Sequence, residues 1–457
     1  MPLSEFPLPA QDAPGNEPPE IRVVPPGPLS RAAVARLEKV ECPAYGSVRE
    51  GRAEQSGVEM APIVLATGRG SNVFDADGNR YVDLAAGFGS VLLGHSAKNV
   101  MRALEGQSDR LTQALGDVYS ADTKIALLER LVALHPGESP RVLLATSGGD
   151  AVTAAIKTAM LATGRPGLCA FEGAYHGLGY GPLPACGLRP SYRAPFAPQL
   201  NTRVTFAPYP RRSEDLDRSL SAVDAALAGG EVGAVLLEPV LGRGGCVVPP
   251  KGFVRQLHEL AHRHGALVVA DEIWTALGRA GSMLRTREVL LAEGGKDADL
   301  DIVCLGKGLG GGLPVSACVA PEPIMQAWAR VPPVVHTSTH AGWPLACATA
   351  VATIDTLRFR KLPERATEMG QRALADLLGA LAGKPGVVEV RGVGLMIGIE
   401  LDGPERALRA CRQMLERGYL LLGGGVRGET LTLTPALTIE EDLLGSAASA
   451  LADCLDP

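Results

Sequence analysis

The stretch that decides the fold runs from residue 301 to residue 316 and reads Asp-Ile-Val-Cys-Leu-Gly-Lys-Gly-Leu-Gly-Gly-Gly-Leu-Pro-Val-Ser. Its opening residues, 301–305, form an almost continuous apolar run, which is typical of a short strand buried on both faces of a sheet. Comparable apolar runs occur upstream, and helix-like stretches separate most of them. The runs cover residues 141–146, 167–171, 233–238 and 266–271, and the helix-like stretches cover residues 151–163, 216–228 and 253–264. This alternation predicts an α/β fold in which helices flank a mainly parallel sheet.

The regions on either side of this alternation follow other patterns. The segment Met1–Pro28 is Pro-rich and predicts a flexible or extended arm, followed by a short helix over residues 30–39. An Asp-Gly-Asn turn within residues 73–83 predicts a hairpin. From about Trp343, a long helical region leads into segments that predict a smaller α+β domain. These segments are strand-like at 386–391, 394–400 and 430–437 and helix-like at 404–417.

The composition argues against several classes of protein. The 457 residues are 46% hydrophobic, which is enough for a sizeable core, and 44 basic against 50 acidic side chains give a formal charge of −6. This mild acidity gives no support for nucleic-acid binding. No apolar run is long enough to predict a membrane span, and the N-terminus lacks the basic-then-apolar order of a secretory signal. The nine cysteines are scattered and none has Cys-x-x-Cys spacing, so no metal site is predicted and a reducing, cytoplasmic setting fits.

Small or polar residues end the apolar runs of the α/β region. In a parallel sheet the carboxyl ends of the strands lie along one edge, where open α/β folds bind ligands. The sequence therefore predicts that an anion-binding turn, two or three carboxylates and one lysine converge on one crevice. These residues are Ser147-Gly148-Gly149, Glu238, Asp271-Glu272 and Gly306-Lys307.

Lys307 carries the most distinctive chemistry of this set. A lysine that points into a dry pocket has a lowered pKa and can attack a carbonyl as an amine nucleophile, forming a Schiff base. The glycines that follow it let the backbone approach a flat ligand closely. Taken alone, a lysine beside glycines is more often a surface residue.

Asp271 and the turn Ser147-Gly148-Gly149 each have a functional and a structural interpretation. A carboxylate at the position of Asp271 could keep a pyridine nitrogen protonated, although Asp271 or Glu272 could equally cap a helix. Backbone N–H groups at the start of an Ala-rich helix, with the Ser147 hydroxyl, would form a phosphate cup. An ordinary strand-to-helix turn would have the same sequence.

The order of these motifs along the chain resembles that of one family, the class III pyridoxal-phosphate aminotransferases of fold type I, over about residues 60–445. The stretches 271–279 and 305–316 are the most specific for that group. The resemblance implies a large domain over residues 96–345 and a smaller α+β domain built from residues 61–95 and 346–457, after an arm and short helix over 1–60. The motifs are the phosphate turn, Tyr175-His176-Gly177, Glu238-Pro239-Val240, Asp271-Glu272-Ile273, Gly306-Lys307-Gly308 and Thr337-Ser338-Thr339.

The resemblance also implies roles for individual residues. Lys307 would carry pyridoxal 5′-phosphate through a Schiff base and move the proton between the substrate carbon and the cofactor, and Asp271 would pair with the pyridine nitrogen. Thr339 would reach the phosphate of the neighbouring subunit in a homodimer. His176 would support its loop. The remaining expected cofactor contacts are Ser147, Gly148 and Gly149 at the phosphate, Tyr175 on the ring face, and Glu238, Ile273 and Ser338.

The sequence departs from the family pattern where relatives bind the substrate. Trp274 replaces a glutamine that contacts the cofactor's ring oxygen, and Leu178 and Thr432 stand where relatives carry carboxylate-binding arginines. Without those arginines the standard glutamate and γ-aminobutyrate reactions are not expected, because a buried carboxylate needs a cationic partner. Arg427 could bind a carboxylate or be a surface loop residue. Gly89, beside Phe88, leaves space in the expected pocket and favours a larger or less acidic amine.

The leading prediction is an aminotransferase that moves an amino group from an amine or amino acid to an oxo acid, aldehyde or oxo-sugar. An aminomutase or an amino-acid racemase on the same fold would retain the same lysine, aspartate and phosphate turn. A cofactor-binding relative without activity is a third possibility, since fold alone does not establish activity.

Overall fold

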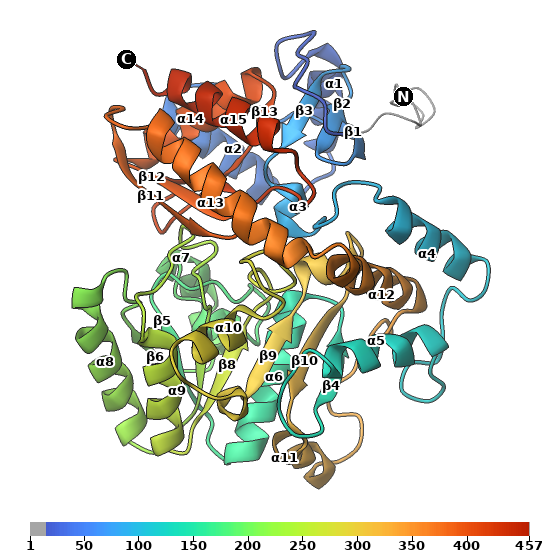
Figure 1. Cartoon of the computed structure of the whole chain (residues 1–457), viewed down its shortest axis with the longest axis vertical. Coiled ribbons are helices and arrows are strands. Elements are labelled where there is room, and N and C mark those ends of the chain that lie inside the picture. The colour runs from blue at the N-terminus through green and yellow to red at the C-terminus, as the bar shows by residue number, and fades with distance from the viewer. Residues whose placement is uncertain (1–14, 457) are drawn as a thin grey trace. The chain divides into compact units, whose positions relative to one another are not determined.

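The computed structural model describes residues 15–456, and the chain forms two compact units (Figure 1). One contains residues 15–97 and 365–456, and the other is Lys98–Glu364. Residues 1–14 of the expected N-terminal arm lie outside the described part of the chain. The division falls at residues 98 and 364, rather than at 96 and 345, because the helix α12 (Pro344–Phe359) packs on α4 (Lys98–Ser108) and α5 (Asp122–Val132).

A seven-stranded sheet runs through the unit Lys98–Glu364, all of which is described, in the order β4-β10-β9-β8-β7-β5-β6. Strand β10 runs antiparallel to both of its neighbours, and the other paired strands are parallel. The predicted α/β fold with a mainly parallel sheet is confirmed. The strands are β4 (Arg141–Ala145), β5 (Gly167–Phe171), β6 (Val204–Ala207), β7 (Val232–Leu237), β8 (Leu267–Asp271), β9 (Ile302–Leu305) and β10 (Ser316–Ala320).

Helices cover both faces of this sheet. The connection from β4 to β5 runs along the sheet in the opposite direction to those that lead from β6 through β7 to β8. Since such crossovers are right-handed, α6 covers one face, and α8 and α9 cover the other, where they pack side by side (Figure 1). The helices are α6 (Gly148–Thr163), α8 (Leu216–Ala228), α9 (Phe253–Arg263) and α10 (Arg285–Ala292), with the short helices α7 (Pro190–Arg193) and α11 (Glu322–Met325).

The core of this unit lies between α6 and the sheet. Ala154, Ala155 and Ala159 of α6 are fully buried, and their small side chains let the helix lie close to the strands. On the sheet side the buried partners include Leu236 and Ile302. This close packing fixes the start of α6 relative to the ends of β7, β8 and β9, which is where the site residues lie.

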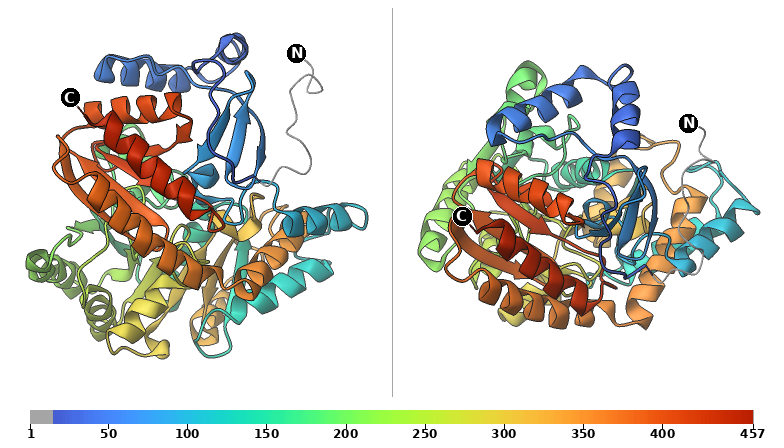
Figure 2. Two further views of the ribbon diagram at one scale, coloured as in Figure 1. Left: turned by 45° about the horizontal axis from the view of Figure 1, so that its top comes forward. Right: turned by 90° about the horizontal axis from the view of Figure 1, so that it is seen from above.

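The other unit contains two four-stranded sheets, counted over its described residues. One has the order β1-β2-β3-β13 and includes the predicted hairpin, and the other has the order β11-β12-β15-β14. Helix α14 packs on the second sheet, on α2 and on α15, which lies beside it (Figure 2). The strands are β1 (Leu65–Arg69), β2 (Asn72–Asp75), β3 (Arg80–Asp83), β11 (Val387–Val393), β12 (Met396–Leu401), β13 (Tyr419–Leu420), β14 (Leu422–Gly424) and β15 (Thr430–Leu433). The helices are α1 (Pro28–Leu37), α2 (Pro43–Ser56), α3 (Ala86–Gly89), α13 (Leu362–Ala380), α14 (Pro404–Glu416) and α15 (Glu441–Cys454).

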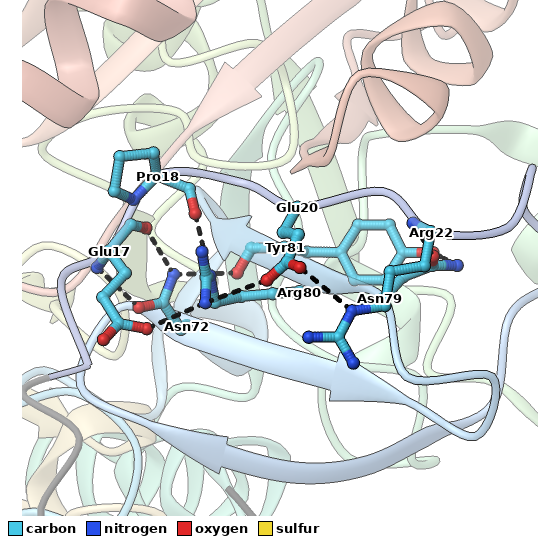
Figure 3. Close-up of polar contacts among 8 residues, drawn as sticks. All are labelled: Glu17, Pro18, Glu20, Arg22, Asn72, Asn79, Arg80 and Tyr81. Carbon is cyan, nitrogen blue, oxygen red and sulfur yellow. Dashed lines mark hydrogen bonds and ion pairs between the residues drawn. The ribbon is translucent and has the colours of Figure 1, made fainter.

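The described part of the N-terminal arm, residues 15–27, lies extended along the hairpin β2–β3 (Figure 3). The backbone N–H groups of Glu20 and Arg80 each donate to the other residue's carbonyl oxygen at 2.9 Å. The buried Asn72 side chain accepts the N–H of Glu17 at 2.8 Å and donates to its carbonyl at 2.9 Å. This segment therefore pairs polar groups along one edge of the hairpin through backbone and side-chain hydrogen bonds.

Candidate active site

The ends of strands β4, β5, β8 and β9 bring four loops together at the carboxyl edge of the large sheet. A Cβ atom added to Gly148 would lie 2.8 Å from Ile273 Cδ1, and one added to Gly306 would lie 3.3 Å from Ile273 Cγ2. Gly177 has a φ of +109°, and a Cβ there would lie 3.1 Å from the Cα of Gly149. Glycine is needed at these close approaches. The turn 147–149 and the loops that follow β8 and β9 therefore lie together at one edge, as predicted, and the Tyr-His-Gly loop joins them.

Lys307 begins a short 3₁₀ turn directly after β9 and its backbone φ is +43°, a left-handed value that is unusual for a side chain with a Cβ. Its Nζ lies 3.5 Å from the centroid of the Trp274 ring. Burial lowers the pKa of Lys307 to about 7, against the opposing charges of Glu238 and Asp271. Lys307 is thus an internal lysine with a nucleophilic amine near neutral pH rather than a solvated surface lysine.

Asp271 ends β8 with a carboxylate that is 5% exposed. Its Oδ2 lies 2.7 Å from Nδ1 of His176, which is itself buried, and its Oδ1 accepts the N–H of Ile273 at 3.2 Å. Burial opposes protonation of His176, but the hydrogen bond and the charge of Asp271 raise its pKa above the ordinary value. An imidazole that donates to Asp271 fixes the orientation of its carboxylate.

The helix-capping role considered for this pair of acidic residues belongs to Glu272. Its carboxylate accepts the N–H groups of Arg285 and Thr286, the first residues of α10, at 3.0 and 2.5 Å. It also accepts the hydroxyl of Thr275 at 2.8 Å. With these bonds Glu272 is structural, and Asp271 keeps its carboxylate for the crevice.

Glu238 holds the Tyr-His-Gly loop from the end of β7. Its Oε1 accepts the N–H of Tyr175 at 2.6 Å and its Oε2 accepts the N–H of Gly242 at 2.9 Å. Burial raises the pKa of Glu238 to about 7. Glu238 therefore fixes two loops of the crevice through their backbones while its charge varies near neutral pH.

The turn Ser147-Gly148-Gly149 has the features of both interpretations that the sequence allowed. The Ser147 hydroxyl caps α6 by accepting the N–H of Asp150 at 3.2 Å. Within the described residues, the N–H groups of Gly148 and Gly149 meet no acceptor, as expected for the first turn of a helix. An ordinary helix cap and an anion cup thus coincide at this turn.

The Tyr175 ring lies beside an arginine that the sequence analysis did not single out. The guanidinium carbon of Arg243 lies 5.0 Å from the centroid of the Tyr175 ring. Arg243 belongs to the Gly-rich turn after β7, which an isolated bridge between Leu241 and Val247 closes. A single arginine among the glycines of a turn just beyond Glu238 was the signal in the sequence.

The comparisons with known proteins identify the family. The family described as aminotransferase class-III matches residues 53–455. The chain belongs to the class III aminotransferases. It is 37% identical to acetylornithine aminotransferase of Methanopyrus kandleri, over 86% of this chain and 94% of that protein. It is also 31% identical to 5-aminovalerate aminotransferase of Pseudomonas aeruginosa, over 87% and 94% of the two chains.

Solved structures of this family share the fold. An amine transaminase from an uncultivated Pseudomonas species, with pyridoxal phosphate bound, superposes with a TM-score of 0.78 at 29% identity and covers 86% of this chain and 94% of its own. Ornithine aminotransferase of Toxoplasma gondii gives a TM-score of 0.79 at 27% identity, over 93% and 94% of the two chains. The predicted fold type I, the aminotransferase activity and the pyridoxal phosphate cofactor are confirmed.

The residues of the aminotransferase fit this cofactor. A flat ring with a basic nitrogen and a phosphate needs a buried carboxylate, a set of N–H donors and an amine, and Asp271, the turn 147–149 and Lys307 offer them. The indole N–H of Trp274 is buried and has no hydrogen-bond partner within residues 15–456. Trp274 thus keeps a donor in place of the glutamine that relatives carry, so the expected loss of a ring-oxygen contact does not follow from the substitution.

Other expected site residues of the aminotransferase belong to other segments of the chain. Thr339 is exposed, and its carbonyl oxygen accepts the side-chain amide of Gln113 at 3.1 Å. Ser338 is partly exposed in the same segment. Phe88, Gly89 and Arg427 belong to the other unit, where Phe88 is 60% exposed and Arg427 is an exposed loop residue. Within the described residues, no cluster of metal-ligating side chains and no helix able to span a membrane is found.

Proposed function

We propose that this class III aminotransferase takes its amino group from the end of an aliphatic chain and passes it to an oxo acid. The similar proteins act, by their names, on acetylornithine, ornithine and 5-aminovalerate, whose chains carry such a terminal amine. This class lies within the broader set of donors and acceptors expected from the sequence.

The observation that carries the proposal is the buried amine of Lys307 against the face of Trp274, at the same strand edge as the Asp271–His176 pair. Pyridoxal phosphate, when bound, supplies an aldehyde that takes up amines and a ring that accepts electrons from the substrate carbon. A lysine with a pKa of about 7 can both donate and accept a proton at neutral pH. Lys307 would therefore hold the cofactor through its Nζ and would move the proton at the substrate carbon.

The other residues bind and orient. Asp271 keeps the pyridine nitrogen protonated, and His176 holds Asp271 in place. The N–H groups of Gly148 and Gly149, with Ser147, bind the phosphate. Tyr175 covers the ring face and Glu238 fixes its loop, while Ile273 packs between the loops.

The test is a half-reaction. Acetylornithine, ornithine or 5-aminovalerate is added to the holoenzyme without an acceptor, and the cofactor's visible absorption is followed. Loss of this absorption with release of the donor's aldehyde, and its return with 2-oxoglutarate or pyruvate, is expected. The variant Lys157→Ala, a lysine of α6 outside the crevice, serves as the matched control and should behave as the parent. An unchanged spectrum with racemised or rearranged substrate would favour an isomerase, and no response to any amine would favour an inactive relative.

We also propose that the protein works as a homodimer in which Thr339 serves the neighbouring site. Thr339 is exposed, and its carbonyl oxygen contacts the Gln113 side chain. Exposed apolar side chains are close in sequence either to Thr339 or to Gln113. These are Leu111, Leu115, Val118, Tyr119, Val334 and Val335. A reducing, cytoplasmic setting stays part of the proposal and is supported by the nine unpaired cysteines.

Mixing two inactive variants tests the shared site. Lys307→Ala and Thr339→Val subunits, mixed after unfolding together, would form heterodimers in which one site has both lesions and the other has neither. About a quarter of the parent activity per site should return if Thr339 acts across a two-fold interface. If Thr339 serves its own subunit, the mixture should stay as weak as its components.

A further inference from the structure

Arg243 lies beside the Tyr175 ring and has no anionic partner among residues 15–456. Its guanidinium lies over the Tyr175 ring at 5.0 Å, and the residue is partly buried in the turn between Leu241 and Val247. The same turn is tied to Glu238, which accepts the N–H of Gly242. Arg243 is therefore held near the Tyr-His-Gly loop by the architecture that also positions Tyr175.

Several other arginines of this unit have acidic partners. Arg255 pairs with Glu259 at 2.5 Å, and Arg287 pairs with Asp297 at 2.7 Å. For Arg243, no carboxylate and no carbonyl oxygen of residues 15–456 lies within hydrogen-bonding or ion-pairing distance. A partly buried guanidinium has lost some hydration without gaining an ion pair, which leaves its fork of N–H donors available for an anion.

The charge of Arg243 reaches the reacting group. Burial lowers the pKa of Lys307, and the charge of Arg243 lowers it further by a smaller amount. Burial raises the pKa of Tyr175, and the charge of Arg243 opposes this rise. An arginine whose field acts on the Lys307 amine is close enough to act on a substrate held there. The phosphate cup, by contrast, lies at the start of α6 and has its own N–H donors.

The sequence lacks the two arginines with which relatives bind carboxylates, since Leu178 and Thr432 stand in their places. We propose that Arg243 supplies this missing function and binds the carboxylate of the oxo acid acceptor, and so determines specificity for it. This inference rests on the proposed transfer to an oxo acid. Arg243 would form paired N–H···O bonds with the carboxylate, as arginine does more readily than lysine.

The experiment compares Arg243→Gln and Arg243→Lys with Arg193→Gln. Arg193 is a matched control, because its guanidinium also lies over an aromatic ring, that of Phe206 at 4.3 Å, but it has no role in the crevice. KM and kcat are measured with pyruvate and with its uncharged methyl ester. Separately, the dissociation constant of glutarate, a carboxylate that does not react, is measured from the change it causes in the holoenzyme's absorption spectrum.

For Arg243→Gln we expect KM for pyruvate and the glutarate dissociation constant to rise about 10- to 100-fold, while KM for the methyl ester changes far less. Arg243→Lys should lie between the parent and Arg243→Gln, and Arg193→Gln should match the parent. Equal losses with pyruvate and the ester, or unchanged glutarate binding, would overturn the proposal and leave Arg243 as a support for Tyr175. If the parent transfers no amino group at all, the proposed function fails. If the parent is active and the Arg243 variants behave like it, only this inference fails.

Discussion

Nδ1 of His176 lies 2.7 Å from Oδ2 of Asp271, and both side chains are buried at the end of β8. The pair links two loops whose sequences are 95 residues apart. Because the imidazole occupies one carboxylate oxygen and the N–H of Ile273 lies at the other, the orientation of Asp271 is set by protein groups alone. A cofactor that pairs with Asp271 thus meets a fixed acceptor.

Removing the imidazole should loosen this acceptor. We expect His176→Ala to raise the dissociation constant of pyridoxal phosphate about 10- to 100-fold, since hydrogen bonds to charged groups contribute about 1.5–3 kcal/mol. His176→Asn, which keeps a donor, should retain part of the affinity. Equilibrium titration of the cofactor-free protein measures both.

The same variant has a pH signature. The pKa of His176 is raised above 6.5, so its contribution to stability is complete below that value and is lost as pH rises through the folded pKa. The fall in melting temperature in His176→Ala should therefore be larger at about pH 6 than at about pH 9. His258→Ala, another buried histidine, whose pKa burial lowers, is the control and should show no such decrease with pH. Cofactor affinity equal to that of the parent would contradict the assigned role of His176.

The lowered pKa of Lys307 predicts how the stability of the cofactor-free protein depends on pH. Burial lowers its pKa from 10.5 to about 7, so between these values the unfolded chain binds more protons than the folded one. Stability from this group is present above the unfolded pKa and is lost as pH falls toward about 7. Lys307→Met removes this cost and should melt at a higher temperature than the parent, by a larger margin at about pH 6 than at about pH 10. The variant Lys157→Met should leave the pH dependence unchanged.

Glu238→Gln tests the electrostatic coupling within the same site. The charge of Glu238 raises the pKa of Lys307, against the larger effect of burial. Its removal should move the pKa of Lys307 further below its ordinary value. The rate of acetylation of Lys307 as a function of pH, followed by mass spectrometry, measures this shift. An upward shift would show that another group controls the amine.

Trp274 should bind the cofactor through its indole N–H. Trp274→Phe keeps an apolar ring beneath Lys307 but removes the donor, and we expect cofactor affinity to fall about 5- to 10-fold. The control is Trp328→Phe, because Trp328 Nε1 already donates to the Thr158 hydroxyl at 2.9 Å. Trp328→Phe should lower stability and leave cofactor affinity as it is. The reverse pattern would show that Trp274 serves only packing.

The predicted strands β5, β7, β8 and β9 are buried along nearly their whole length, whereas β4, which is only partly buried, was predictable from its apolar run over residues 142–145. Residues 233–238 and 301–305 carry apolar side chains at nearly every position, as a strand covered on both faces requires. Strand β10 was not predicted, because its Ser316–Ala320 sequence is short and small and its antiparallel direction depends on pairing with both β4 and β9. Strand β6 was missed because its residues are only partly buried.

Some residues of the candidate site could likewise be predicted from the sequence, and others could not. Lys307, Asp271 and the turn 147–149 could be found because each ends a strand and has a residue type that the chemistry requires. The separate roles of Asp271 and Glu272 could not, since they depend on where α10 begins. Arg243 was missed because carboxylate binding was sought at the positions that relatives use, and only the three-dimensional structure brings its side chain to Tyr175.

We propose above that the Lys307 amine holds the aldehyde of pyridoxal phosphate. Reducing the holoenzyme with borohydride and mapping its peptides by mass spectrometry tests this claim most directly. We expect one phosphopyridoxyl group, on the peptide that contains residues 301–316, and none in Lys307→Ala. An adduct on a different lysine, or no adduct in a protein that retains its cofactor absorption, would contradict it.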